Sequence, residues 1–383
     1  MKLLPQIIFF SIFFTVYGLV NYYIVKRGLA VISPSFKTIY LIVLIFFVLS
    51  FVLGRFLERT DIPVLPQALT WIGSFWLAFM LYFFLSILLI DILRLINHFI
   101  PFFPSIITEN REAAKKITAL IVVSITFLFV IGGHINTYFP VIKNVNIEVG
   151  KKAGDMKELN IALVSDLHLG SILGDSFLER IEKKIEALKP DIILFAGDIV
   201  DEDVGSILKN NIGSTLKRYK APLGIYAITG NHEYFSGADA AADYLNSHGV
   251  VMLRDTVVKI NDAFYLAGRE DRQRNSTGRK RKEITDLLKD VDKSLPLILM
   301  DHQPFKLEEA ANNNVDLQVS GHTHNGQLWP FNYITDMVYE IAWGYKKKEN
   351  THIYVSCGVG TWGPPVRTGS RPEVVNIRIK FAQ

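Results

Sequence analysis

Hydrophobic residues are concentrated in the first third of the chain, where four apolar stretches follow one another. The stretches cover residues 3–25, 38–57, 68–90 and 117–133. Each is close to the ~20 residues that a helix needs to cross the hydrocarbon core of a bilayer. Lys26 and Arg27 follow the first stretch in place of a small-residue cleavage site, so we interpret it as a span and not as a signal peptide. We therefore predict an α-helical transmembrane domain with four spans over residues 1–139.

From Pro140 onward the pattern changes to short apolar runs that alternate with amphipathic segments. An apolar run over 160–164 is followed by a predicted helix over 175–188, and strands are predicted over 192–196, 224–229 and 297–300. Alternation of this kind is typical of an α/β domain. We predict that residues 140–383 form this second domain.

Polar residues follow each of these predicted strands. They are Asp166 and His168, then Asp198, then Asn231 and His232, and then His302, while His322 and His324 come later in the chain. Side chains two apart share a face of a strand, and ligands in α/β sheets gather at the carboxyl edge. The pattern therefore predicts one cluster of carboxylate, amide and imidazole groups. Mixed oxygen and nitrogen ligands suit manganese, iron or zinc better than magnesium or calcium.

Charge and cysteine content exclude some classes of protein. The net charge is only +4 over 383 residues, and the basic residues form short clusters and not a continuous face, which argues against a nucleic-acid partner. The single cysteine, Cys357, cannot form an internal disulfide. Hydrophobic residues make up 50% of the chain, which is high for a soluble protein and agrees with a membrane domain.

Five short motifs stand in a fixed order in the second domain. They are Asp166-Leu-His168, Gly197-Asp198, Gly230-Asn-His-Glu233, His302 and Gly321-His-Thr-His324. With these motifs, residues 160–378 resemble the calcineurin-like metallophosphoesterase superfamily. The run Gly-Thr-Trp-Gly-Pro-Pro-Val-Arg at 360–367 is similar to its bacterial membrane-attached branch. Asn325 departs from that branch, which often has Gly there, but this puts no ligand in doubt.

The resemblance implies a metal-dependent phosphoric ester hydrolase, built as a two-sheet β-sandwich flanked by helices. It implies two divalent metal ions, with manganese as the first choice and iron or zinc as alternatives. One ion would be held by Asp166, His168, Asp198 and His324, and the other by Asp198, Asn231, His302 and His322, so that Asp198 bridges. Two such ions generate a hydroxide between them at neutral pH, which attacks phosphorus.

Three further residues have supporting roles by the same resemblance. His232 is not a ligand, so its imidazole is free to stabilise or protonate the leaving oxygen. Asp201 would orient His232, and Glu233 would support the ligands without taking part in chemistry. His248 and His352 lie outside every motif, and we interpret them as structural.

Basic residues near the spans bear on orientation, because four spans place the N-terminus and the second domain on one side. The opposite side carries Lys26, Arg27, Lys37, Arg94, Arg111, Lys115 and Lys116, and the domain's side carries Lys2, Arg55, Arg59, Lys143, Lys151 and Lys152. The side with more basic residues is usually cytoplasmic. This count favours an integral protein of the bacterial cell membrane with an extracytoplasmic catalytic domain.

A catalytic domain tied to the bilayer favours a substrate that is itself in the membrane, such as a phosphorylated lipid or a lipid-linked sugar phosphate. The sequence does not distinguish between a phosphomonoester, a phosphodiester and a pyrophosphate as the bond that is hydrolysed. A cytoplasm-facing pyrophosphatase of a nucleotide-activated acylated sugar is the enzymatic alternative. A non-catalytic receptor or sensor stabilised by metals is the alternative from another class. The sequence does not indicate an oligomeric state.

Two segments of unusual composition each allow two interpretations. The basic run 272–282 is either a solvated loop or a surface for anionic lipid head groups. The aromatic segment 328–348 is either part of the core or an element that enters the head-group layer.

Overall fold

A computed structural model describes residues 3–58, 60, 62, 64–170, 172–201 and 204–383. The chain divides into two compact units: the first comprises 1–135 with 363–366, and the second comprises 136–362 with 367–383. Lys2 and Arg59, which entered the count of basic residues, lie outside the described residues. The domain boundary at Pro140 stays a prediction from composition.

The first unit is helical. Its helices are α1 (Leu3–Leu29), the 3-10 turn η1 (Pro34–Phe36), α2 (Lys37–Leu57), α3 (Leu65–Phe99), the short α4 (Ser105–Glu109) and α5 (Arg111–Thr137). Among the described residues, three helical segments are long and apolar enough to cross a membrane: Pro34–Leu57, Leu65–Phe99 and Arg111–Thr137. The predicted span at 3–25 lies within α1, which is not among those three. The structure thus supports three of the four predicted spans.

A small polar core lies between α1 and α3. Asn21 is buried, and it accepts a hydrogen bond from the indole Nε1 of Trp76 at 3.0 Å while donating to the carbonyl of Tyr17 at 2.8 Å. Leu44 of α2 packs beside Trp76 and Tyr17. Most other apolar side chains of these helices point outward, as expected where lipid and not water is the surrounding solvent.

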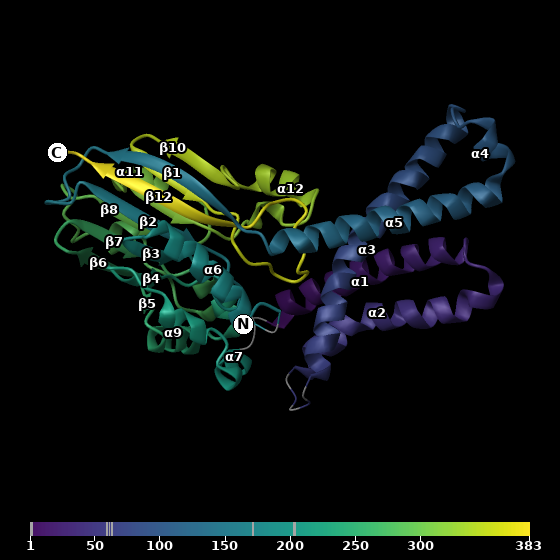
Figure 1. Cartoon of the computed structure of the whole chain (residues 1–383), viewed down its shortest axis with the longest axis horizontal. Helices are drawn as coiled ribbons and strands as arrows, with labels where there is room; N and C mark the ends of the chain where they lie inside the picture. Colours follow the sequence, from purple (N-terminus) through teal and green to yellow (C-terminus); the bar gives the residue numbers. More distant parts are fainter. Residues whose placement is uncertain (1–2, 59, 61, 63, 171, 202–203) are drawn as a thin grey trace. The chain divides into compact units, whose positions relative to one another are not determined.

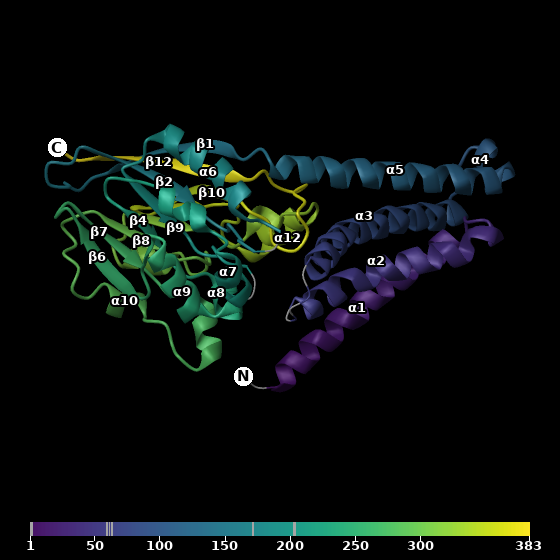
Figure 2. The same cartoon turned by 60° about the horizontal axis from the view of Figure 1, so that its bottom comes forward.

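The second unit contains two six-stranded sheets that pack face to face (Figure 1, Figure 2). The first sheet has the order β1 (Val141–Val149), β12 (Glu373–Phe381), β2 (Glu158–Val164), β3 (Ile192–Phe195), β4 (Ile225–Ala227) and β5 (Val251–Met252). The second has the order β10 (Gly344–Lys348), β11 (Thr351–Val355), β9 (Leu317–Ser320), β8 (Leu297–Met300), β7 (Phe264–Gly268) and β6 (Thr256–Ile260). The predicted two-sheet sandwich is confirmed.

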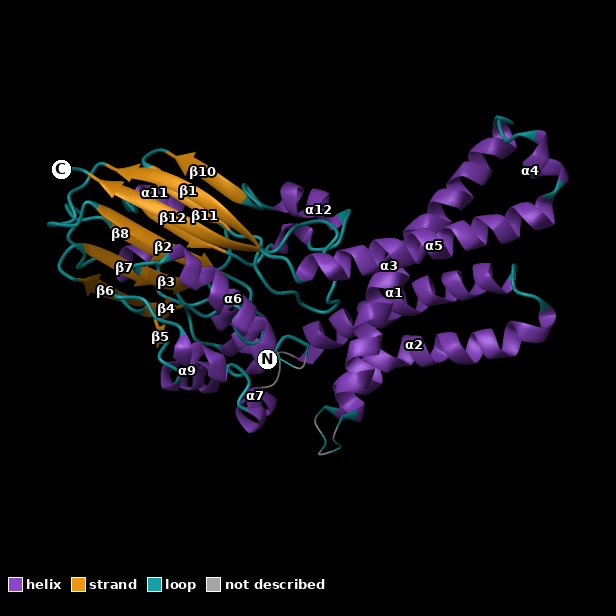
Figure 3. Cartoon of the chain, in the orientation of Figure 1, coloured by secondary structure: helices purple, strands orange, loops and turns teal. Residues whose placement is uncertain are grey.

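Apolar side chains fill the space between the sheets because the strands of both carry long aliphatic runs. Leu163 and Ile377 of the first sheet pack against Leu266 and Val319 of the second, and all four are fully buried. Strands that are apolar on both faces need cover on the outside as well. Helices provide it, as the purple ribbons beside the orange strands in Figure 3 show.

The covering helices are short except for α6 (Asp175–Leu188), which has the bounds predicted for it. Leu178 and Ile181 of α6 pack on Ile193 and Phe195 of β3. The remaining helices of this unit are α7 (Val204–Asn210), α8 (Asn231–Ser236), α9 (Ala238–Ser247), α10 (Ile284–Leu287), α11 (Glu308–Asn312) and α12 (Phe331–Val338). Of these, α10 and α11 cover the outer face of the second sheet.

Strand direction fixes which edge of the first sheet carries the polar residues. β2, β3 and β4 are parallel to one another, and β2 is antiparallel to β12, with Leu163 opposite Val375. β12 in turn is parallel to β1, with Val141 opposite Glu373. The carboxyl ends of β2, β3 and β4 therefore lie at the edge where β1 begins. That edge is also where the chain enters this unit from α5.

Candidate metal centre

Close backbone approach explains the glycine that precedes two of the predicted ligands, Asn231 and His322. A Cβ atom at Gly230 would lie 2.1 Å from Oδ1 of Asp198, and one at Gly321 would lie 1.7 Å from Oγ of Ser165. Carbon and oxygen cannot approach to these distances, so a side chain at either position would push the strand ends apart. Glycine at these two positions therefore lets the ends of β3, β4, β9 and β2 converge.

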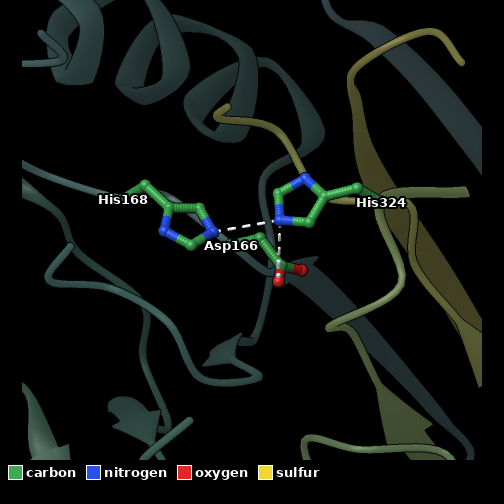
Figure 4. A group of neighbouring side chains, drawn as sticks. All are labelled: Asp166, His168 and His324. Atoms are coloured by element: carbon green, nitrogen blue, oxygen red, sulfur yellow. Dashed lines mark hydrogen bonds and ion pairs between the residues drawn. The ribbon is translucent and has the colours of Figure 1, made fainter. Parts of the chain in front are cut away.

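The first group of converging side chains is Asp166, His168 and His324 (Figure 4). Nε2 of His324 lies 3.0 Å from Nε2 of His168 and 3.4 Å from Oδ1 of Asp166. All three residues are buried, with 3% or less of their surface exposed. Two imidazole nitrogens and a carboxylate that are buried this close together form a donor set that fits a metal ion.

The second group is Asp198, His302 and His322. Nε2 of His302 lies 3.0 Å from Oδ2 of Asp198, and Nδ1 of His322 lies 2.8 Å from Oδ1 of Asn231. His168 also lies near Asp198, with 3.9 Å between Nε2 and Oδ2. Asp198 thus stands between the two groups, in the position expected of a carboxylate that bridges two ions.

Hydrogen bonds at the far side of the rings fit metal binding by two of the histidines. Nδ1 of His302 lies 2.7 Å from the carbonyl oxygen of Ala196, to which only an N–H can donate. Nδ1 of His168 lies 3.0 Å from Oδ1 of Asp201 in the same way. Protonation at Nδ1 leaves the lone pair of Nε2 directed into the cluster, and second contacts of this kind orient histidine ligands in metal sites.

The backbone at five of the seven predicted ligands is left-handed. The φ angles are 55° at Asp166, 49° at His168, 52° at Asp198, 75° at His322 and 49° at His324. L-residues rarely adopt this conformation, which costs about 1 kcal/mol or more each. Such conformations persist where surrounding structure imposes them, and they cluster at functional sites.

Burial and charge act in opposite directions on the two carboxylates of the cluster. Burial raises the pKa of Asp166 above its ordinary value, although the positive charge of His302 opposes it. Burial would also raise the pKa of Asp198, but the charge of His302 and its hydrogen bond outweigh burial, and that pKa falls well below the ordinary value. Asp198 is therefore ionised, as a ligand must be.

Asp201 connects His232 to the cluster. Its Oδ1 lies 2.7 Å from Nδ1 of His232 and 3.0 Å from Nδ1 of His168. Burial alone would lower the pKa of His232, but the hydrogen bond to Asp201 and the charge of Asp198 outweigh it and raise the pKa to about 9. His232 also falls within one group of potential ligands, with His168 and Asp198. The role of Asp201 in orienting His232 stays a prediction.

Glu233 accepts hydrogen bonds from the loops that carry two of the predicted ligands. Its side chain is fully buried, and its two oxygens accept hydrogen bonds from the backbone N–H groups of Ile199, Val200, Gly230 and Asp198 at 2.6–3.1 Å. A single carboxylate thus holds the loop after β3 against the loop after β4. Because these loops carry Asp198 and Asn231, Glu233 fixes the distance between two predicted ligands.

Arg367 is a residue of the centre that the sequence motifs did not single out. It is 1% exposed, its Nη2 lies 3.0 Å from Nδ1 of His324, and its Nη1 donates to the carbonyl of Gly358 at 2.8 Å. The hydroxyl of Ser165 likewise donates to Asp166. A signal for Arg367 was present, because it closes the run at 360–367 that resembles the membrane-attached branch.

Contacts and exposure bear on the alternative interpretations of the basic run 272–282 and the aromatic segment 328–348. In the basic run, Arg274 pairs with Asp255 at 2.9 Å and Arg281 with Asp301 at 2.9 Å, so these two cations stabilise the domain itself. The aromatic segment is largely on the surface: Trp329, Phe331, Tyr333, Trp343 and Tyr345 are all exposed. Core packing therefore does not explain these five side chains.

Comparison with known proteins gives a family match that includes every predicted ligand. The calcineurin-like phosphoesterase family matches residues 159–326. An uncharacterized metallophosphoesterase of Aquifex aeolicus is 36% identical over 250 residues, which cover 64% of this chain and 94% of that protein. A transmembrane protein with a metallophosphoesterase domain from Danio rerio is 30% identical over 301 residues, which cover 72% of this chain and 67% of that protein.

A third relative carries a specific activity in its name. The UDP-2,3-diacylglucosamine pyrophosphatase of Chlamydia trachomatis is 27% identical over 312 residues, which cover 65% of this chain and 92% of that protein.

Proposed function

Because this chain belongs to the calcineurin-like metallophosphoesterase family, we propose that it hydrolyses a phosphoester or pyrophosphate bond of a lipid or lipid-linked substrate. Its phosphoester hydrolase domain is joined to helices that are long and apolar enough to span a membrane. The observation that supports the proposal best is the position of Asp198 between Asp166, His168 and His324 on one side and His302 and His322 on the other.

The metal ions would be held by the two groups of side chains that converge on Asp198. We assign Asp166, His168, Asp198 and His324 to one ion, and Asp198, Asn231, His302 and His322 to the other. When bound, two divalent ions supply a hydroxide at neutral pH and polarise the phosphoryl oxygens. Mixed oxygen and nitrogen donors favour manganese, with iron or zinc as alternatives.

The leaving oxygen needs a proton, and His232 is the residue in a position to give it. A pKa of about 9 keeps its ring protonated at neutral pH. Asp201 accepts from Nδ1 at 2.7 Å, which leaves Nε2–H as the donor toward the leaving group. A positioned acid of this kind contributes about 10²–10⁴-fold to rate.

The surroundings of His232 favour an apolar leaving group. The rings of Phe235 and Trp362 lie with their centroids 5.7 Å and 6.4 Å from the imidazole, and both side chains are more than half exposed. Exposed aromatic rings beside a catalytic acid fit a substrate that brings its own apolar surface.

A second candidate is hydrolysis of the pyrophosphate of a nucleotide-activated acylated sugar. It is favoured by the likeness to the chlamydial pyrophosphatase, which covers 92% of that protein. This activity requires a domain that faces the cytoplasm, whereas the count of basic residues favours an extracytoplasmic domain. A reporter fused after Gln383, active on one side of the membrane only, separates the two orientations.

The proposal is tested with the purified full chain in lipid nanodiscs and manganese. The probes are a lipid phosphomonoester, a lipid phosphodiester and UDP-2,3-diacylglucosamine, with release of phosphate, head group or UMP as the readout. Hydrolysis of a lipid probe well above that of a water-soluble aryl phosphodiester supports the proposal. Bound metal without turnover of any probe would contradict it and favour a receptor.

A further inference from the structure

The helix α12 (Phe331–Val338) presents an apolar face to its surroundings. Five of its eight residues are large apolar or aromatic side chains that are exposed, from 40% at Phe331 to 78% at Met337. The others in this set are Tyr333, Ile334 and Val338. At about 100° per residue these five side chains cover one arc of about 160°. No residue of α12, all of which the structure describes, is buried.

The polar side of α12 is partly buried against the rest of the domain. Asn332 and Thr335 are half-buried, and the backbone at Asn332 lies against Gly326. A surface helix of a soluble domain normally turns its apolar stripe to the core and its polar side to water. α12 has the reverse arrangement, with Trp329 and Trp343 exposed in the segments before and after it.

Hydrogen bonds join the segment that leads into α12 to the loop at residues 367–370. The carbonyl of Gln327 accepts from the N–H groups of Thr368 and Gly369 at 3.0 and 2.9 Å, and the N–H of Trp329 donates to Oγ1 of Thr368 at 3.0 Å. The hydroxyl of Ser370, in the same loop, donates to the carbonyl of His324 at 2.8 Å. The segment that leads directly into α12 is therefore anchored to the domain.

The same loop is bonded to the end of the last candidate span. Nδ2 of Asn136 donates to the carbonyls of Arg367 and Ser370 at 2.9 and 3.0 Å. Asn136 is the next-to-last residue of α5, and the apolar stretch predicted to cross the bilayer ends at residue 133. Three helical residues rise only about 5 Å, so the loop bonded to Asn136 lies close to the end of this predicted span.

The geometry points to α12 as an interfacial helix that inserts its apolar face into the head-group and acyl boundary of the bilayer that α5 crosses. Tryptophan and tyrosine beside an amphipathic helix are the composition that this layer favours. Inserted there, α12 would lie a few residues from His324 and would guide a lipid toward the centre. That purpose rests on the proposed function, whereas insertion itself does not.

Insertion is measured on the full chain in nanodiscs of phosphatidylcholine and phosphatidylglycerol, without turnover. Met337→Cys carries an environment-sensitive fluorophore, and Asp262→Cys, in the turn between β6 and β7 where the aspartate side chain is 91% exposed, is the matched control. That turn precedes β7, so it lies at the sheet edge away from the carboxyl ends. Native Cys357 is buried, and the unmodified chain gives the labelling blank.

We expect nitroxide-labelled lipids to quench the fluorophore at 337 severalfold more than the one at 262, and aqueous iodide to show the opposite order. Equal quenching at the two positions would overturn the inference. Protection from iodide that grows with protein concentration, without quenching by lipid, would also overturn it and would favour a second copy of the chain.

A second variant links insertion to turnover. Met337→Asp should lower hydrolysis of a bilayer-embedded lipid probe severalfold and leave hydrolysis of a soluble aryl phosphodiester unchanged. Equal loss on both probes would mean that α12 only supports the fold, which contradicts the inference. Absence of turnover in every variant and in the native chain would count against the proposed function, while the quenching result would still decide insertion.

Discussion

The metal centre and α12 depart from the usual rule of burial in opposite directions. At the centre, carboxylates and imidazoles such as Asp166, Asp198 and His302 are enclosed in the protein, although charged groups are rarely buried without strong partners. At α12, side chains such as Ile334 and Met337 are exposed, although large apolar groups are usually covered.

We propose that each departure is compensated by a partner that is not protein. Buried anions and imidazoles are compensated by cations, and an exposed apolar face is compensated by lipid. The two regions lie within ten residues of one another along the chain, since His324 ends the last ligand motif and α12 begins at Phe331. A hydrolase of membrane substrates needs both, and the following substitutions separate the two contributions.

The largest effect is expected from Asp198→Asn. The amide cannot carry the negative charge that stands between the two groups of ligands, so hydrolysis of every probe should fall to near the background rate. Turnover of a soluble aryl phosphodiester measures this. Asp175→Asn, which changes a carboxylate at the start of α6, is the matched control and should keep most of the activity. Full activity of the Asp198→Asn variant would contradict the proposed role of Asp198 at the metal centre.

His232→Ala should slow turnover without loss of metal. Removal of a positioned acid conventionally costs about 10²–10⁴-fold in kcat, whereas the groups around Asp198 keep their proposed ligands. Elemental analysis and kcat are measured on the same sample. His248→Ala is the control, because His248 bonds only within its own surroundings at Tyr244, Ser247 and Asn211. Loss of metal with His232 would identify this residue as a ligand.

Glu233→Ala should act on stability first. It removes the acceptor for four buried backbone N–H groups, and each unsatisfied buried group costs about 1–3 kcal/mol. A loss of about 3 kcal/mol or more in the free energy of unfolding is expected, measured by urea denaturation of the full chain in detergent. An unchanged midpoint would mean that the loops after β3 and β4 are held together by other contacts.

The smallest effect, and the one specific to lipid, is expected from Trp362→Ala. Loss of an apolar contact of this size corresponds to about tenfold weaker binding of an apolar partner. KM for a bilayer-embedded probe should rise accordingly, with no change for a soluble aryl phosphodiester. Trp362→Leu keeps an apolar surface and should recover part of the effect. An equal change on both probes would assign Trp362 to the chemistry instead.

Local patterns were sufficient to predict much of the second domain. The helix α6 and the strand β8 have the bounds expected from periodicity, because amphipathic and fully apolar runs have distinct signatures. The side chains of Asp166, Asp198 and His302 come together as predicted, since each follows a strand at the carboxyl edge. Their roles as ligands stay a prediction.

Long-range contacts explain what was not predicted. Arg367 meets His324 across a loop, and Phe235 and Trp362 meet at His232 from segments more than a hundred residues apart. The hydrophobic pattern of a single segment does not predict contacts between side chains so far apart in the sequence. The sequence pattern also does not predict whether the apolar face of α12 is buried or exposed. Apolar residues have the same spacing in a helix that faces a core and in one that faces a bilayer, so only the fold distinguishes the two.

The central claim is that Asp198 joins two metal ions, and elemental analysis of the purified full chain tests it most directly. After incubation with manganese and removal of free metal, we expect about two ions per native chain and one or fewer per Asp198→Asn chain. No bound metal in the native chain, or an unchanged pair of ions in the variant, would contradict it.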